Sequence, residues 1–122
     1  MSLKRILVAD DDTSYKNSLI RALSYNYEID SAVNAKEAMI KITQNIYSII
    51  ITDNQMGDNY IDNGIYLIEE IRKLGLRIPI FFISADINNE IKDIVQKIGA
   101  NEILKKPVDI KELKEKLKEY IK

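Results

Sequence analysis

The sequence contains no cysteine and no histidine. The lack of cysteine excludes disulfide bonds and thiolate catalysis, and the lack of both residue types excludes zinc sites of the usual kind. Any bound metal must therefore be held by oxygen atoms, which favours magnesium, manganese or calcium. Without histidine, the chain also cannot carry a phosphoryl group on an imidazole ring or use that ring as a general base.

An excess of charge of one sign and long apolar runs are also absent. The chain has 18 basic and 19 acidic residues among 122, so its formal charge of −1 gives no overall attraction to nucleic acid or to an anionic membrane. No apolar run approaches the ~20 residues needed to span a bilayer, and no signal peptide is recognisable, so we expect a cytoplasmic protein. The composition, 46% hydrophobic and 30% charged, fits one globular domain over residues 1–122, with no weight given to residues 1–3.

Short apolar runs alternate with segments of helical spacing. The runs are rich in β-branched residues and predict strands at Arg5–Ala9, Tyr27–Ala32, Ser48–Thr52, Ile78–Ile83 and Glu102–Lys105. The third and fourth runs do not alternate between apolar and polar residues, which is typical of strands buried on both faces of a parallel sheet. Apolar residues three and four positions apart predict five helices, each with one buried face. The residues of these faces include, in chain order, Leu19 with Leu23, then Ala38 with Ile42, then Ile68 with Ile71, then Ile91 with Ile94 and Val95, and last Leu113 with Leu117.

Polar residues and glycines at the ends of these segments predict helix caps. The expected N-terminal caps are Asn34, Asp86 with Asn89, and Asp109. Left-handed C-terminal caps are expected at Gly75 and Gly99. The whole pattern predicts an α/β fold of five βα units, (βα)5, in which a doubly wound, five-stranded parallel sheet lies between helices on both faces.

Polar side chains follow four of the five predicted strands. They are Asp10, Asp11 and Asp12 after the first, Asp53 after the third, Ser84 and Asp86 after the fourth, and Lys106 and Pro107 after the fifth. Ligands of open α/β sheets bind beyond the carboxyl ends of the strands, so we expect these side chains to converge. Clustered carboxylates repel one another, and burial raises that cost, so the cluster predicts a hard divalent cation, Mg²⁺ first and Mn²⁺ as the alternative.

An aspartate beside such a cation can act as a nucleophile towards phosphorus, because carboxylates form acyl phosphates. Asp53 is the candidate, with Lys106, the Ser84 hydroxyl and the metal each covering one phosphoryl oxygen. Each site residue also has a plainer interpretation, as a helix cap, a turn residue, a loop serine or a surface lysine. Asp12 is the acid that we assign to a cap, and Tyr15 is assigned to packing or to the rim of the fold.

Four strand-end segments, considered together, carry a family resemblance. They are Ile6–Asp12, Ile49–Met56, Phe82–Ala85 and Lys105–Pro107. In their order and approximate spacing they resemble the receiver domain of two-component response regulators. The resemblance implies the flavodoxin-like strand order 2-1-3-4-5. It also implies a phosphoprotein in which Asp53 accepts a phosphoryl group from a histidine kinase or a histidine phosphotransfer protein.

The resemblance further implies roles for the individual site residues. The metal ligands would be Asp11 directly, Asp10 more often through water, Asp53, and the backbone carbonyl of Gln55. Ser84 would stand at the family's hydroxyl position. Lys106 would be the family's lysine, with a cis bond to Pro107.

The sequence departs from the family pattern at two places. Gly57 stands where many members have proline, and the segment Gly57–Gly64 is about three residues longer than usual, which leaves a more flexible loop beside the site. Asp58 or Asp62 in this loop is either a solvated acid or a further group near the metal. Ile103 stands where many members have an aromatic residue, which argues against a coupled hydroxyl–aromatic rotation. A change spread over the fourth helix and fifth strand stays open.

The resemblance implies a signalling role. Enzymatic chemistry would be limited to self-phosphorylation from small donors and to slow self-dephosphorylation. In the dephosphorylation, the side chains of Gln55 and Asp86 are expected to flank the attacking water. Phosphorylation would alter contacts with a downstream protein or output domain, without direct binding of nucleic acid or membrane, and homodimerisation on phosphorylation is a further option. Two other hypotheses stay open. One is a phosphorylation-independent interaction module, and the other is a metal-dependent phosphatase, which Gln55 disfavours because it stands where a second acid would be needed. Whether the chain is a stand-alone receiver or part of a longer protein also stays open.

Overall fold

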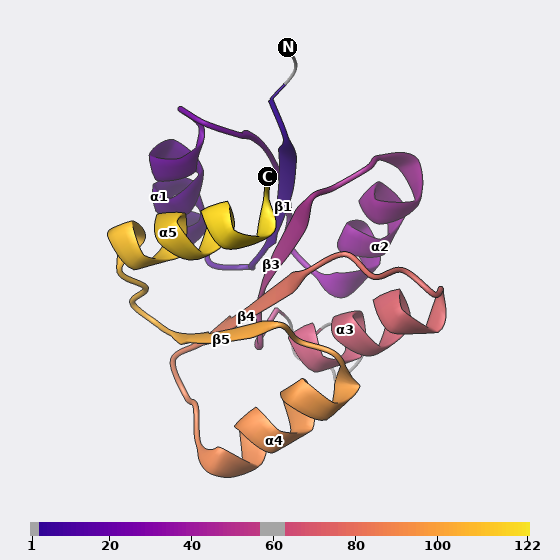
Figure 1. Ribbon diagram of the computed structural model, residues 1–122. Coiled ribbons are helices and arrows are strands. Elements are labelled where there is room, and N and C mark those ends of the chain that lie inside the picture. Colours follow the sequence, from indigo (N-terminus) through magenta and orange to yellow (C-terminus); the bar gives the residue numbers. More distant parts are fainter. Residues whose placement is uncertain (1–2, 57–62) are drawn as a thin grey trace.

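The computed structural model describes residues 3–56 and 63–122. Across these residues, a five-stranded parallel sheet in the order β2-β1-β3-β4-β5 lies between helices on both faces (Figure 1). The strands are β1 (Arg5–Ala9), β2 (Glu28–Ala32), β3 (Ile49–Asp53), β4 (Ile80–Ser84) and β5 (Glu102–Lys105). The helices are α1 (Thr13–Leu23), α2 (Ala35–Gln44), α3 (Gly64–Lys73), α4 (Asn89–Ile98) and α5 (Ile110–Tyr120). The predicted α/β class and the strand order 2-1-3-4-5 are confirmed.

Two apolar layers cover the sheet, one on each face. Helices α1 and α5 lie over one face, where the buried cluster consists of Ile6, Val8, Leu19, Leu23, Ile49, Ile51, Phe81, Ile83, Leu104, Leu113 and Leu117. Helices α2, α3 and α4 lie over the other face, where the cluster includes Leu7, Ile42, Ile50, Leu67, Ile71, Phe82 and Val95. Successive residues of β3 and β4 alternate between the two clusters, which explains why both runs are continuously apolar.

The strand bounds place two candidate site residues within the sheet itself. Asp53 and Ser84 are the last residues of β3 and β4, whereas the sequence pattern predicts both just after the strands. β4 begins at Ile80 instead of Ile78, because Pro79 has no N–H to donate to the ladder. The pairing of β3 with β4 includes Asp53 opposite Ile83, so the backbone of Asp53 is fixed by its neighbouring strand.

Caps set the ends of the helices. The N-caps predicted at Asn34 and Asp109 are confirmed, since each side chain accepts a backbone N–H three residues later, at 2.8 and 3.0 Å. Gly75 and Gly99 adopt positive φ values of 78° and 117°, as predicted for left-handed helix ends. Within residues 3–56 and 63–122, no helix is long and apolar enough to cross a bilayer.

Helix α4 differs from its prediction in two respects. Its N-cap is Asn88, whose side chain accepts the N–H of Ile91 at 2.8 Å, so the predicted opening by Asp86 and Asn89 is wrong. The three neighbouring polar residues are all competent caps, and cap chemistry alone therefore does not determine where the helix begins. Ile94, predicted to lie on the buried face, is 37% exposed.

Candidate functional site

The end of β1 delivers neighbouring acids to the carboxyl edge of the sheet. Asp10 is fully buried, and its carboxylate accepts the N–H of Asp12 at 2.9 Å, which turns the chain into α1. Asp12 is the N-cap of α1, as predicted, and accepts the N–H of Tyr15 at 3.1 Å. Asp11 lies between them and is exposed. Because Asp12 is committed to the cap, Asp10 and Asp11 are the acids that this strand contributes to the site.

Asp53 completes a group of three acids. Its exposed fraction is only 8%, and one carboxylate oxygen from each of Asp10, Asp11 and Asp53 lies within 4.8 Å of the others. The chain after Asp53 is tied to α3, since the N–H of Gly64 donates to the carbonyl oxygen of Asn54 at 2.8 Å. A Cβ at Gly64 would stand 2.2 Å from the carbonyl oxygen of Asp53, so only glycine permits this close approach.

Lys106 brings a positive charge to these acids. Its Nζ lies 2.9 Å from Asp10 Oδ2 and 3.4 Å from Asp53 Oδ2. Its backbone N–H donates to the carbonyl oxygen of Ser84 at 2.9 Å, which holds the lysine beside the end of β4. The bond to Pro107 is cis, as the family resemblance implies. Burial opposes the charged form, but the hydrogen bond to Asp10 and the charges of the two acids outweigh it and raise the pKa of Lys106.

The negative charge around Asp53 is not fully balanced. Burial of the carboxyl group and then the charge of Asp10 raise the pKa of Asp53 to about 6, against the opposing effect of Lys106. The ammonium of Lys106 therefore does not offset the combined effect of burial and of the charge of Asp10 on this carboxyl group. The site electrostatics favour the binding of a further cation.

The donor set fits a hard divalent cation. Asp10, Asp11 and Asp53 offer carboxylate oxygens, which suit Mg²⁺ or Mn²⁺ and do not suit soft metals. Burial of Asp53 and the charge of Asp10 beside it both disfavour the ionised carboxylate, and a cation at this place would offset both effects. Gln55 lies two residues after Asp53 with its side chain exposed, and its carbonyl as a further ligand stays a prediction.

Ionisation of Asp53 is expected to reduce the stability of the metal-free protein as the pH rises from about 4 to about 6. In this range the folded state holds a proton on Asp53 that the unfolded state, with an ordinary pKa of 3.8, has released. Stability falls with rising pH wherever the folded state binds more protons than the unfolded state. Urea unfolding of the wild type and of Asp53→Asn, both in chelator, measures the effect. The free energy of unfolding of Asp53→Asn should increasingly exceed that of the wild type as the pH rises across this range. A difference that does not change with pH would contradict the raised pKa of Asp53.

Ser84 lies at the end of β4 with its hydroxyl engaged by its own loop. The side chain is buried, donates to the carbonyl oxygen of Asp86 at 3.3 Å and accepts the N–H of Asp86 at 3.2 Å. Both distances are long for bonds to a hydroxyl, so a rotation about the Cα–Cβ bond of Ser84 loses little hydrogen-bond energy. Asp86 is exposed in the loop before α4, and its place beside an attacking water stays a prediction.

The two departures from the family pattern have different outcomes. The predictions for Gly57, Asp58 and Asp62 fall outside the residues that the structure describes. Ile103 pairs with Phe82 of β4 and is partly buried against the cluster beneath α2, α3 and α4. The fifth strand thus presents an aliphatic side chain at this position, packed against that cluster.

Tyr15 contacts the site, although the sequence alone indicates only a packing or rim role for it. Lys106 Nζ lies 4.3 Å from the centroid of its ring, and its hydroxyl accepts the N–H of Val108 at 3.2 Å. Tyr15 and Val108 are 93 positions apart in the chain, so no local spacing could have revealed the contact. The ring forms one wall around the lysine ammonium.

Comparison with known proteins agrees with this arrangement of residues. The family model for the response regulator receiver domain matches residues 6–118. The chain belongs to the response regulator receiver domain family. The match covers all four strand ends at which the site residues lie, so the receiver fold and the resemblance noted in the sequence are both confirmed.

Relatives of this receiver domain include much longer proteins. The chain is 36% identical over 109 residues to the DNA-binding transcriptional regulator NtrC of Bradyrhizobium sp. (strain RP501 Parasponia), covering 88% of the chain and 22% of that relative. It is 34% identical over 108 residues to the autoinducer 2 sensor kinase/phosphatase LuxQ of Vibrio parahaemolyticus, covering 88% of the chain and 12% of that relative. The receiver domain thus spans only a small part of these curated relatives.

A solved structure supports the same fold. The response regulator receiver domain protein (CheY-like) from Methanospirillum hungatei JF-1 superposes with a TM-score of 0.88 at 31% sequence identity. The alignment covers 97% of this chain and 93% of that chain. The likeness therefore extends over the whole receiver fold and includes each strand that carries a candidate site residue.

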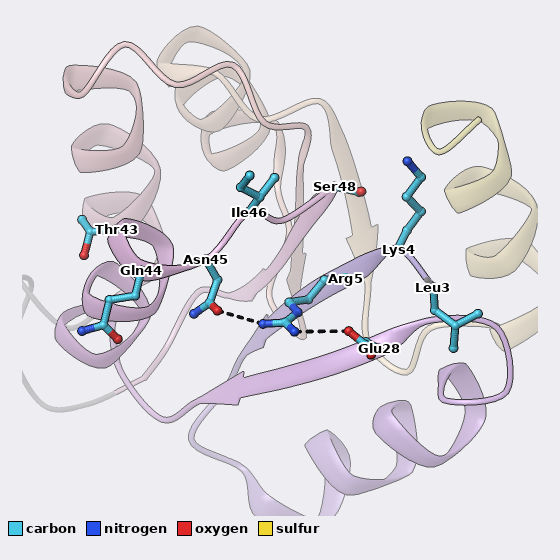
Figure 2. A pocket seen from close by; sticks show the side chains of 9 residues that line it. All are labelled: Leu3, Lys4, Arg5, Glu28, Thr43, Gln44, Asn45, Ile46 and Ser48. Atoms are coloured by element: carbon cyan, nitrogen blue, oxygen red, sulfur yellow. Dashed lines mark hydrogen bonds and ion pairs between the residues drawn. The ribbon is translucent and has the colours of Figure 1, made fainter. Parts of the chain in front are cut away.

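A depression of about 790 Å³ lies at the opposite end of the sheet of the receiver domain. Figure 2 shows that its lining comes from the start of β1, the start of β2, the end of α2 and the segment between α2 and β3. Arg5 within it donates to Asn45 Oδ1 at 2.8 Å and pairs with Glu28 at 3.2 Å. Because these residues lie at the amino ends of the strands, the depression takes no part in the candidate site, despite its size.

Proposed function

We propose that this receiver domain accepts a phosphoryl group on Asp53, with a divalent cation bound beside it, and so acts as a switch in two-component signalling. The observation that carries the proposal is the position of Lys106, whose ammonium bridges Asp10 and Asp53 at 2.9 and 3.4 Å. An ammonium held between a buried acid and a second carboxylate can pair with the negative charge of the phosphoryl oxygens when phosphorus is attached to that carboxylate.

Asp53 is suited to be the nucleophile. Its pKa of about 6 leaves the carboxylate mostly ionised at neutral pH, while burial makes the group less solvated than a surface acid. One carboxylate oxygen forms a bond to phosphorus, and the bond from phosphorus to the donor breaks. The donor is a phosphohistidine that lies outside these 122 residues, because they contain no histidine. The electron pair of the broken bond stays on the imidazole nitrogen, which takes up a proton.

The other side chains stabilise charge on the phosphoryl oxygens. Lys106 neutralises one oxygen from its place beside Asp53. Ser84 gives up its long hydrogen bonds to Asp86 and donates to a second oxygen. A divalent cation held by Asp10, Asp11 and Asp53 would supply the charge for a third oxygen.

The phosphorylated state would then bias contacts with a downstream protein or output domain. The phosphoryl group adds about −1.5 to −2 charges at neutral pH, which draws Ser84 and Lys106 inward. Movement of Ser84 changes the loop into α4, and movement of Lys106 changes the turn into α5. Such shifts bias a pre-existing equilibrium between two packings of the fold. The relatives, a DNA-binding regulator and a sensor kinase/phosphatase, fit a switch of this kind.

Labelling with acetyl phosphate tests the proposal without a partner protein. In Mg²⁺, intact mass spectrometry is expected to show one phosphoryl adduct per chain, which hydroxylamine removes because an acyl phosphate is labile to it. Reduction with borohydride and peptide mapping should place the adduct at Asp53. Excess chelator is expected to abolish the labelling. Labelling that is indifferent to chelator, or that maps to another residue, would overturn the proposal.

A further inference from the structure

We infer that Tyr15 is a positioning residue for Lys106, holding both the ammonium of the lysine and the backbone that follows it. The inference rests on the proposed function, since the positioned lysine is the one that would cover a phosphoryl oxygen on Asp53. Tyr15 touches no reacting atom. It acts through the lysine, and one side chain secures that lysine at two separate points.

The first attachment is the face of the tyrosine ring. Lys106 Nζ lies 4.3 Å from the ring centroid, within the range in which an aromatic face attracts a cation. The lysine side chain is only 15% exposed, so little water competes for this face. The ammonium therefore donates to Asp10, forms an ion pair with Asp53 and has the ring as a third neighbour.

The second attachment is the tyrosine hydroxyl. It accepts the N–H of Val108 at 3.2 Å, two residues after the lysine and directly before the N-cap of α5. The contact holds the turn that carries Lys106 against α1. A residue that only filled space beside the core would explain neither the ring placed under the ammonium nor the hydroxyl placed on this backbone.

Tyr15 is itself held by the acidic segment of the site. Its backbone N–H donates to the side chain of Asp12, the N-cap of α1. The backbone N–H of Asp12 in turn donates to the carboxylate of Asp10, the acid that pairs with the lysine. A closed circuit thus joins Asp10, Asp12, Tyr15 and Lys106, in which each member limits the freedom of the next.

Positioning matters because the ammonium has competing places to rest. Lys106 lies closer to Asp10 than to Asp53, at 2.9 against 3.4 Å. To cover a phosphoryl oxygen on Asp53, the ammonium must not collapse onto Asp10 or turn into water. A flexible four-carbon stem gives no such restraint, whereas an aromatic face on one side limits the ammonium to the space between the two acids.

Two substitutions at Tyr15 separate its two attachments. Tyr15→Phe keeps the ring and removes the hydroxyl, while Tyr15→Leu removes both. The rate of labelling by acetyl phosphate at saturating Mg²⁺ is expected to fall roughly two- to thirtyfold in Tyr15→Leu. The rate in Tyr15→Phe should lie between those of the wild type and Tyr15→Leu, because the ring stays and only the hydroxyl contact with Val108 is lost. Tyr25→Leu serves as the matched control, because Tyr25 follows the same helix and is 85% exposed.

A double-mutant cycle distinguishes positioning from general packing. If Tyr15 acts through the lysine, Tyr15→Leu should cause no further loss of rate in a Lys106→Ala background. An equal fall in both backgrounds would overturn the inference, since the ring would then act without the ammonium. Thermal unfolding of each variant verifies that it is folded at the temperature of the assay.

Nuclear magnetic resonance provides a readout that is independent of phosphorylation. The ring current of Tyr15 is expected to shift the ε-methylene protons of Lys106 upfield in the wild type and in Tyr15→Phe, and to vanish in Tyr15→Leu. If the ε-methylene protons of Lys106 in the wild type have the chemical shifts of an ordinary lysine, the inference is overturned even if labelling is normal. If acetyl phosphate fails to label the wild type, the proposed function fails, while the shift still reports where the ammonium lies. If the Lys106→Ala rate is too slow to measure, this readout alone decides.

Discussion

Asp53→Asn is expected to abolish labelling by acetyl phosphate while the receiver fold is retained. An amide is not a nucleophile that forms a stable acyl phosphate, and the substitution also removes a carboxylate from the predicted metal ligands. Asparagine has nearly the same shape, and the backbone at this position is fixed by the pairing of β3 with Ile83 of β4. The loss should therefore be essentially complete without unfolding, as seen by intact mass after incubation in Mg²⁺ and by circular dichroism.

The matched control is Asp93→Asn, which removes an exposed carboxylate from α4. This variant carries the same change in charge and should be labelled at the wild-type rate. Asp53→Asn should also be more stable than the wild type in chelator near neutral pH, because a carboxyl with a pKa raised to about 6 opposes folding when ionised. Labelling that survives in Asp53→Asn would move the acceptor to another residue.

Gly64→Ala is expected to destabilise the fold by about 3 kcal/mol, towards the upper end for overpacking of a buried position. The new Cβ would lie 2.2 Å from the carbonyl oxygen of Asp53, and 3.1 Å from both its carbonyl carbon and Thr52 Oγ1. The nearest atom belongs to a buried strand, so it cannot turn aside as a flexible side chain would. Relief requires α3 to retreat from β3, which displaces the segment that carries Asp53.

Gly75→Ala is the control for Gly64→Ala. Gly75 has a φ of 78° but no atom within 4 Å of an added Cβ, so only the left-handed backbone opposes alanine there. That strain is worth roughly 1–2 kcal/mol. Urea unfolding should therefore rank Gly64→Ala as the less stable variant, with labelling impaired only in it. An equal or smaller loss at Gly64 would show that α3 does not approach Asp53 so closely.

The fold could be predicted because its signals are local and consistent. Continuous apolar runs at β3 and β4 require a parallel sheet buried on both faces, and the intervening helical spacing supplies the covering layers. Errors arose where several residues satisfied the same local rule. Asp86, Asn88 and Asn89 are all competent N-caps, and packing of the helix, which the sequence does not display, selected Asn88.

The positions of the main site residues could be predicted for a different reason. The ends of parallel strands must meet at one edge, so Asp10, Asp53 and Lys106 were expected to be neighbours from topology alone. Contacts that depend on distances across the fold were not foreseen. The ring of Tyr15 beneath Lys106 and the approach of Gly64 to Asp53 both require the three-dimensional packing of a helix against a distant segment.

The ion pair between Lys106 and Asp10 joins residues that are 96 positions apart. A ribosome therefore releases the acids of β1 and β3 long before it releases their counter-ion. Until β5 docks, the buried carboxylates lack the partner that makes their proximity tolerable, and the earlier strands have an electrostatic reason to stay apart. Docking of the last strand is thus also the step that brings Lys106 to Asp10 and Asp53.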